Sequence, residues 1–159
     1  MARYDVEQAV RDVATMFKNN LNTKIAAINT EKGDFSISTI DSNAWFFHHI
    51  PVVWNYPVFM IYGFENLSLN GFQEDNAVEA IELFFEVAIP DTNEAASEAQ
   101  VYKLLRYARA LKEIAQENYD CLRGYGKIKV ASLTPALIEI NGKRLRSSGV
   151  TITASISSS

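Results

Sequence analysis

Two long segments of the chain carry apolar residues at every third or fourth position, and each predicts an amphipathic helix. The first segment covers residues 5–29, with apolar positions at Val6, Val10, Val13, Phe17, Leu21, Ile25 and Ile28. The second covers residues 97–118, with apolar positions at Val101, Leu104, Leu105, Ala108, Leu111 and Ala115. Gly33 is placed to end the first helix, and Ser97 with Gln100 forms a capping box that begins the second.

Between the two helices, the hydrophobic pattern changes to one that predicts strands. Residues 58–62 form a solid apolar run, which is typical of a strand buried on both faces. Residues 81–89 largely alternate between apolar and polar, and Pro90 ends that strand. Residues 67–75 are loop-like, with Asn70-Gly71 as a turn signal, and could form a hairpin tip between the two strands.

Strand patterns also follow the second helix. Residues 127–133 and 136–140 are separated by Pro135, which predicts a bend, a bulge or a sheet edge. Asn141-Gly142 is the strongest hairpin signal in the chain. Residues 150–156 alternate strictly, which predicts one buried face, and the last three serines are expected to fray.

This order of segments predicts the fold class. Two one-faced helices and several strands must bury their apolar faces against each other. We therefore expect an α+β fold in which a long helix packs across a mixed, mainly antiparallel sheet and an N-terminal amphipathic helix adds a second surface. A length of 159 residues predicts a single domain over residues 1–159, and a hydrophobic fraction of 48% excludes a disordered chain.

Composition narrows the setting in which the protein works. No stretch approaches the roughly 20 apolar residues that a membrane span needs, so no membrane partner is expected. The first residues are charged and lack an apolar signal region, which predicts a protein that stays where it is made. Cys121 is the single cysteine, which excludes an intramolecular disulfide and fits a reducing compartment. The net charge of −4 gives the whole chain no attraction to DNA.

The residues that could carry chemistry do not form a recognisable catalytic or metal-binding pattern. His48 and His49 are adjacent, so in an extended segment they point to opposite sides and cannot easily share a metal. Cys121 has no catalytic motif around it, and Gly124-Tyr125-Gly126 lacks the phosphate-loop and dinucleotide signatures. Alternate glutamates on the strand are expected to face solvent; they are Glu79, Glu82 and Glu86. We expect no enzyme, no metal and no cofactor.

Basic residues recur along the second helix and around the later strands. They are Lys103, Arg106, Arg109, Lys112, Arg123, Lys127, Lys129, Lys143, Arg144 and Arg146. Three interpretations are open: contact with nucleic acid, a solvated face with a charged hairpin that resists edge pairing, or ion pairs between subunits. Interfacial ion pairs fit an assembly protein best. We select Lys143, Arg144 and Arg146 as candidates for contact with a neighbouring subunit or another partner protein.

The aromatic-rich residues 45–56 are the best candidate for a functional surface. Tryptophan and tyrosine are typical anchors of protein interfaces, although core packing would also use them. The segment has no clean period and holds more large aromatic residues than a core strand alone needs. We therefore expect part of it to lie between subunits, with Trp45, Phe46 and Trp54 as the anchors.

The succession of segments resembles the phage tail terminator (tail completion) family of the lambda type, and related head–tail connector and neck proteins are similar. The resemblance covers most of the chain as a pattern of elements and not as an invariant motif. It rests on the opening helix, the 56–62 strand, the 84–90 strand, the 101–117 helix and the closing 146–156 strand. Residues 34–55 depart most from the family pattern.

The resemblance implies a structural virion protein in the tail or neck. Members of the family form hexameric rings at the head-proximal end of the tail, where they end tail-tube polymerisation and join the tail to the head. It implies contacts with the tail tube protein and a head-completion or neck protein, and DNA passing through the lumen without sequence-specific binding. The alternatives are another neck or connector protein, or a small nucleic-acid-binding module that uses the basic stripe of the second helix.

Overall fold

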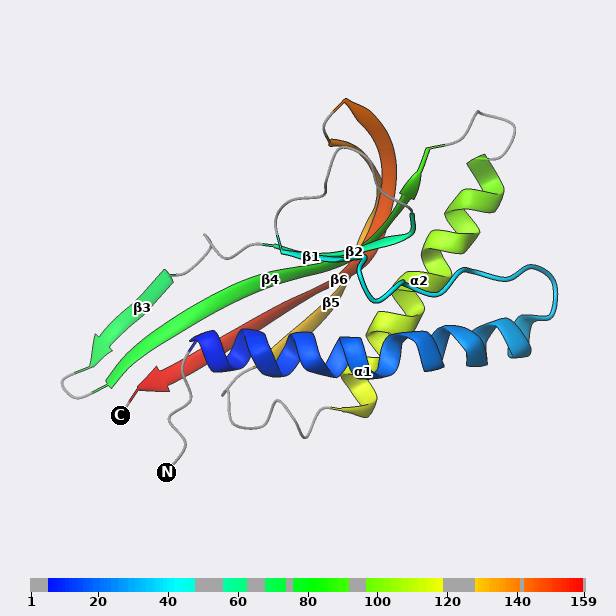
Figure 1. Ribbon diagram of the computed structural model, residues 1–159. Helices are drawn as coiled ribbons and strands as arrows, with labels where there is room; N and C mark the ends of the chain where they lie inside the picture. The colour runs from blue at the N-terminus through cyan, green and yellow to red at the C-terminus, as the bar shows by residue number, and fades with distance from the viewer. Residues whose placement is uncertain are drawn as a thin grey trace.

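The computed structural model describes residues 6–47, 56–62, 68–73, 76–91, 97–118, 128–140 and 142–158. Within this part of the chain there are two helices and six strands (Figure 1). In chain order they are α1 (Val6–Lys32), β1 (Trp45–Phe47), β2 (Val58–Tyr62), β3 (Ser68–Gln73), β4 (Asn76–Pro90), α2 (Ser97–Glu117), β5 (Ile128–Ile140) and β6 (Lys143–Ser158).

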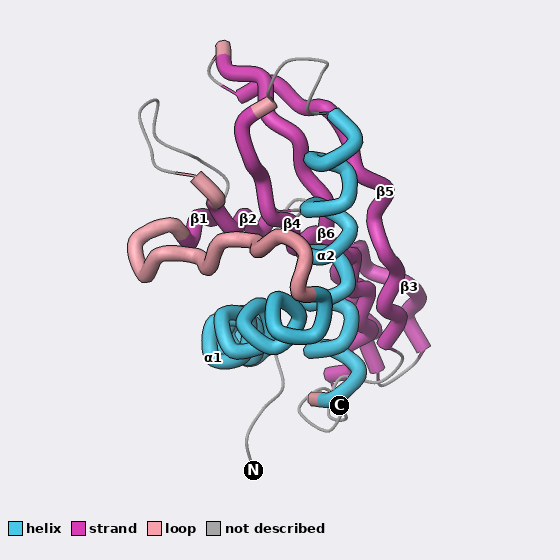
Figure 2. The backbone as a smooth tube through the Cα atoms, turned by 90° about the vertical axis from the view of Figure 1, so that its right-hand side faces the viewer, coloured by secondary structure: helices cyan, strands magenta, loops and turns pink. Residues whose placement is uncertain are grey.

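The strands form one sheet in the order β1-β2-β4-β6-β5, and β3 pairs with β4 outside this path. β1 runs parallel to β2, whereas every other described pairing is antiparallel. The long strands β4 and β6 pair along most of their lengths at the centre of the sheet. Both helices lie on the same side of it, and α2 packs across β4, β5 and β6 (Figures 1 and 2). The predicted α+β architecture is confirmed.

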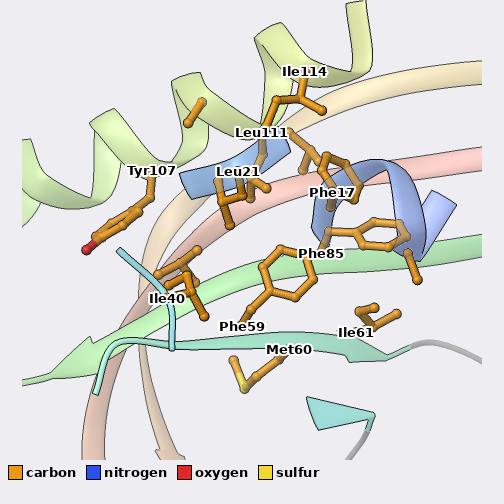
Figure 3. Packing of buried hydrophobic residues seen from close by; sticks show 14 of the residues in the cluster. Phe17, Leu21, Ile40, Phe59, Met60, Ile61, Phe85, Tyr107, Leu111 and Ile114 are labelled. Atoms are coloured by element: carbon orange, nitrogen blue, oxygen red, sulfur yellow. The ribbon is translucent and has the colours of Figure 1, made fainter. Parts of the chain in front are cut away.

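The helix α1 buries the apolar face that its sequence predicted. Its buried residues include Val13, Phe17, Leu21, Ile25 and Ile28. The ring centre of Phe17 lies 4.8 Å from that of Phe85 in β4 and 5.9 Å from that of Phe59 in β2 (Figure 3). Tilted aromatic contacts at these distances add to the free energy gained by burying each ring. They place the centre of the core between α1 and the middle of the sheet.

The ends of the helices follow the predictions only in part. Gly33 has φ of +68°, and its N–H donates to the carbonyl of Asn29 at 3.1 Å, so glycine ends α1 as predicted. The helix α2 begins at Ser97, also as predicted. The predicted capping box does not form, because the side chain of Gln100 does not turn back to Ser97. Instead its amide Nε2 donates to the carbonyl of Pro90 at 2.6 Å.

Residues 33–44 return from the end of α1 to β1 as a non-helical segment beside α1 (Figure 2). Two asparagines of α1 hold this segment by binding both backbone groups of one residue each. Asn22 binds the N–H and the carbonyl of Ile40 at 2.8 and 2.9 Å. Asn29 binds those of Ile37 at the same two distances. Side-chain hydrogen bonds from α1 therefore hold this segment in place. Hydrophobic periodicity does not reveal such bonds.

Pairing between distant strands lengthens the sheet beyond its predicted segments. Residues 68–73, predicted to be a loop, form β3, and Asn70-Gly71 lies inside that strand where the register shifts. Gln73 still pairs with Asn76 beyond this point, so Asn70-Gly71 is not the turn of the hairpin. Ser157 and Ser158, predicted to fray, pair with the start of β4. A neighbouring strand supplies hydrogen-bond partners to backbone groups that the local sequence alone does not commit to a strand.

The β5–β6 hairpin agrees with its sequence signals. β5 lies at the end of the strand order and its register with β6 shifts around Pro135, so the proline marks both a bulge-like irregularity and an edge strand. Ile140 pairs with Lys143, which closes the hairpin by the two-residue loop predicted at residues 141–142. Gly142 has φ of +76°, the left-handed conformation that this turn requires.

The sheet face away from the helices is buried near its centre, although alternation predicted solvent there. Glu86 is 7% exposed, and Thr151 in β6 is also buried, so that β6 has more than one buried face. The hydroxyl of Tyr62 donates to the Glu86 carboxylate, and the hydroxyl of Ser147 donates to it at 3.4 Å. Burial raises the pKa of Glu86 because it removes water from the charged form, and the two hydroxyl donors only partly oppose this rise.

This raised pKa predicts a pH dependence of stability. A group whose pKa is higher in the folded state stabilises the fold below its ordinary pKa of 4.5, and that contribution is lost as pH rises through the folded value. We expect the Glu86→Gln variant to gain stability relative to the parent between about pH 4 and about pH 7. Urea unfolding at several pH values measures this difference. Glu82→Gln, at an exposed position four residues earlier, is the control and should show no such trend. Parallel pH profiles for the parent and Glu86→Gln would contradict the prediction.

Candidate assembly surface

The helix α2 exposes two large apolar side chains, Tyr102 at 48% and Leu105 at 47%, which we call the α2 patch. The preceding residue, Leu104, is fully buried. The prediction that Leu105 belongs to the apolar stripe of α2 is therefore wrong. The helix turns about 100° per residue, so Leu105 points away from Leu104 and lies at the edge of the buried stripe. Tyr102 lies three residues earlier and so shares the direction of Leu105. The sequence signal that could have found the patch is this second apolar pair beside the main stripe.

A hollow of about 320 Å³ adjoins the α2 patch, between the end of α1, the start of the 33–44 segment and α2. The guanidinium of Arg106 lies 3.7 Å from the ring centre of Phe35 and donates to the two carboxylate oxygens of Asp34 at 2.7 and 2.8 Å. Hydrogen bonds from Arg106 lower the pKa of the Asp34 carboxyl. An apolar patch bordered by such ordered charged groups has the anatomy of a protein interface.

The basic stripe of α2 is partly neutralised within the chain. Arg106 is buried in its pairing with Asp34. Arg109 donates to the carboxylate of Glu31 at 2.7 and 3.1 Å and to that of Glu113 at 2.8 Å. These contacts leave the stripe with less free positive charge than its sequence indicates. Of the other predicted basic positions, Arg123 and Lys127 lie outside the described residues, as does the side chain of Lys129.

The predicted aromatic anchors lie at the border of the core. Trp45 is half-buried, and its ring centre is 4.5 Å from that of Phe59. Phe46 is also half-buried and packs against the core, while Trp54 lies outside the described residues. Phe47, which the prediction did not single out, is 45% exposed, and the ammonium of Lys18 lies 5.6 Å from its ring centre. Half-burial leaves part of Trp45 and Phe46 for contact with another subunit, so their interface role stays a prediction.

The predicted charged residues of the β5–β6 hairpin differ in their surroundings. Arg146 donates to the carboxylate of Asp91 at 2.8 Å, which fixes it against the end of β4. Arg144 lies 3.8 Å from the same carboxylate, and its side chain is 65% exposed. Lys143 pairs with β5 through its backbone, and its side chain lies outside the described residues. Of the two arginine side chains that the structure describes in this hairpin, that of Arg144 is therefore the more available to a partner.

The residues that could carry chemistry are mostly outside the described part of the chain. These are His48, His49, Cys121 and residues 124–126. Among the described residues, no group of three or more histidine, cysteine, aspartate or glutamate side chains is arranged to hold a metal ion. Of the strand glutamates, Glu82 is exposed, Glu86 is buried and the side chain of Glu79 is not described.

No protein-family model matches the chain, and no curated protein matches it either. Neither α1 nor α2, the helices of the described residues, is long and apolar enough to cross a membrane.

Proposed function

We propose that this chain is a structural virion protein that forms a ring at the head-proximal end of a phage tail. In this role it ends tail-tube polymerisation and joins the tail to the head, with the tail tube protein and a head-completion or neck protein as partners. DNA passes through the lumen of the ring without sequence-specific binding. The function requires no cofactor and no catalytic residue, and a hexameric homo-oligomer is the expected form.

The observation that carries the proposal is the α2 patch on a fold of the expected plan. An N-terminal helix, a mainly antiparallel sheet, a long helix across it and a C-terminal pair of strands follow the order of the family that the sequence resembles. A similar fold by itself does not define a function. Exposed tyrosine and leucine beside fixed ion pairs add a reason for assembly, because burial of this apolar surface against another subunit is favourable.

A closed ring needs two different patches on each subunit, because each copy contacts the next in a head-to-tail manner. The α2 patch supplies the apolar patch in this proposal. The exposed Arg144 at the hairpin, together with the half-buried Trp45 and Phe46, supplies candidates for the complementary one. Apolar anchors would provide most of the free energy of contact, and the charged groups at its border would set the register.

The sharpest test is a charge placed in the α2 patch. We expect Leu105→Asp to leave the subunit folded, because this side chain is half-exposed, and to weaken assembly by at least about 2 kcal/mol, or roughly thirtyfold. Sedimentation velocity over a range of concentrations measures the weakening, and circular dichroism checks the fold. Gln116→Asp adds the same charge at an exposed position on the same helix and should assemble like the parent.

Electron microscopy then tests the ring and its place. Negative-stain images of the assembled parent protein should show annular particles, and a virion structure should show several copies around the tail axis. A single copy in the particle, or equal assembly of Leu105→Asp and the parent, would overturn the proposal. A mobility-shift assay with duplex DNA tests the nucleic-acid-binding alternative, which requires tight binding by the isolated subunit that falls steeply with salt.

A further inference from the structure

A second pocket, of about 290 Å³, lies beside the first turns of α2 and is distinct from the hollow beside the α2 patch. Its walls are the first turns of α2, residues 36–38, residues 56–57 and the end of β4. The polar side chains that line it include Gln100, Lys103, Tyr107 and two serines, and none of the described lining residues carries a carboxylate. We call it the Gln100 pocket. Its volume is at the small end of the range for ligand sites, roughly 300–1,000 Å³.

Gln100 brings a buried acceptor without a partner to this pocket. The residue is 5% exposed, and its Nε2 donates to the carbonyl of Pro90 at 2.6 Å. Because only the nitrogen of the amide can donate to a carbonyl, this bond fixes which end of the side chain is the oxygen. That oxygen, Oε1, has no hydrogen-bond partner among the described residues. The oxygen is itself covered, so a donor on a ligand reaches it when the amide shifts toward the pocket. A buried acceptor without a partner favours such a shift, because it gains a hydrogen bond from a ligand N–H or O–H.

Lys103 gives the same pocket a positive charge. It lies three residues after Gln100, on the same side of α2, and both residues line the pocket. Unlike Arg106 and Arg109, Lys103 makes no ion pair with any described residue. The first turns of a helix add a positive potential of their own. Because Lys103 is the charged residue among the described lining, this part of the pocket favours an anionic group.

Residues 36–38 offer backbone groups in the orientation that a strand would use. Asn29 of α1 takes both the N–H and the carbonyl of Ile37, so these two groups point to the same side, toward α1. In an extended chain, the groups of the neighbouring residues point to the other side. The carbonyl of Ser38 follows this rule, since it accepts a hydrogen bond at 2.7 Å from the hydroxyl of Tyr107, which lines the pocket. Because that carbonyl already accepts from Tyr107, an extended peptide would pair with the N–H of Ser38 and the backbone groups of Ser36.

We propose that the Gln100 pocket binds the C-terminal end of an extended peptide of a partner protein. The terminal carboxylate pairs with Lys103, a peptide N–H donates to Oε1 of Gln100, and the peptide lies along residues 36–38. A peptide end meets all three features, whereas inorganic phosphate at neutral pH offers Gln100 few donors. The site does not depend on the ring proposed above, because all its residues come from one subunit.

The test uses the full chain and an immobilised library of hexapeptides, synthesised once with a free C-terminal carboxylate and once with a C-terminal amide. We expect binders in the carboxylate library whose amide counterparts bind at least about tenfold more weakly, since a charge-assisted bond is lost. The best of these peptides should shift the side-chain NH₂ resonances of Gln100 in NMR spectra. A library without carboxylate-selective binders would overturn the proposal. So would inorganic phosphate that shifts these resonances as strongly as the peptide does, because the site would then recognise any anion.

Two lysine variants of the same helix separate this pocket from general charge effects. Lys103→Gln should weaken binding of the selected peptide at least about tenfold and leave the melting temperature near that of the parent, because the side chain is only half-buried. Lys112→Gln removes the same charge at an exposed position that does not line the pocket and should bind like the parent. Equal binding by both variants would contradict the role of Lys103. Oligomer formation by Lys103→Gln reports on the ring separately.

Discussion

Replacement of Gly149 by alanine is expected to destabilise the fold by at least about 3 kcal/mol, at or beyond the usual upper range for overpacking. A Cβ atom at this position would lie 1.8 Å from the carbonyl oxygen of Phe85 and 2.8 Å from the Cα of Glu86. Both obstructing atoms belong to the backbone of β4, so no side chain can rotate away to make room. Urea unfolding of the parent and the variant measures the change in the free energy of unfolding.

Gly33→Ala is the matched control for this prediction. Gly33 has φ of +68°, which strains any other residue, but a Cβ there would meet nothing within 4 Å. Its replacement should cost about 1–2 kcal/mol from backbone strain alone. A Gly149→Ala variant no less stable than Gly33→Ala would show that β4 and β6 do not approach each other as closely as the structure indicates.

The role of Gly149 also shows what the sequence could not predict. Ser147-Ser148-Gly149 has the composition of a turn, and the strand pattern becomes clear only from Val150 onward. In the structure these residues lie inside β6, opposite the region where the register of β5 shifts, and the hairpin curves strongly beyond this point (Figure 1). A glycine that permits close approach of two strands leaves no periodic signal, because the cause is a backbone more than 60 residues away.

Predictions that depend on local pattern were the most accurate. α1 and α2 follow from their apolar spacing, and the β5–β6 hairpin follows from its turn residues. β3 was missed because its strand character depends on pairing with β4 and not on its own residues. The sequence therefore predicts the elements with their own periodicity, and the tertiary pairing decides the others.

The polar residues of greatest interest were harder to interpret from the sequence. Alternation assigned Glu86 to solvent, yet Tyr62 and Ser147, which are distant in sequence, enclose it. Gln100 fitted a local capping motif, but the carbonyl of Pro90 competes for its side chain. In both cases a long-range hydrogen bond replaces the local interaction that the pattern favours. Such positions are where sequence and structure are expected to disagree and where binding or pH sensitivity can arise.

Two neighbouring leucines of α2 give the most direct separation of folding from assembly. The side chain of Leu104 is fully buried. Leu104→Asp therefore buries a charge without a partner and should destabilise the subunit by about 4 kcal/mol or more. This is a large part of the 5–15 kcal/mol that typically holds a domain together. Thermal and urea unfolding followed by circular dichroism should show a variant that is unfolded or strongly weakened.

Leu105→Asp makes the identical chemical change one residue later, where the side chain is half-exposed. Its melting temperature should stay within a few degrees of the parent, because surface substitutions away from buried groups usually change stability by no more than about 0.5 kcal/mol. The pair thus predicts opposite results in two assays: loss of folding at Leu104, and loss of assembly with folding retained at Leu105. If Leu104→Asp melted near the parent, this face of α2 would not be core. If Leu105→Asp unfolded instead, the α2 patch would be part of the fold and not a surface for a second subunit.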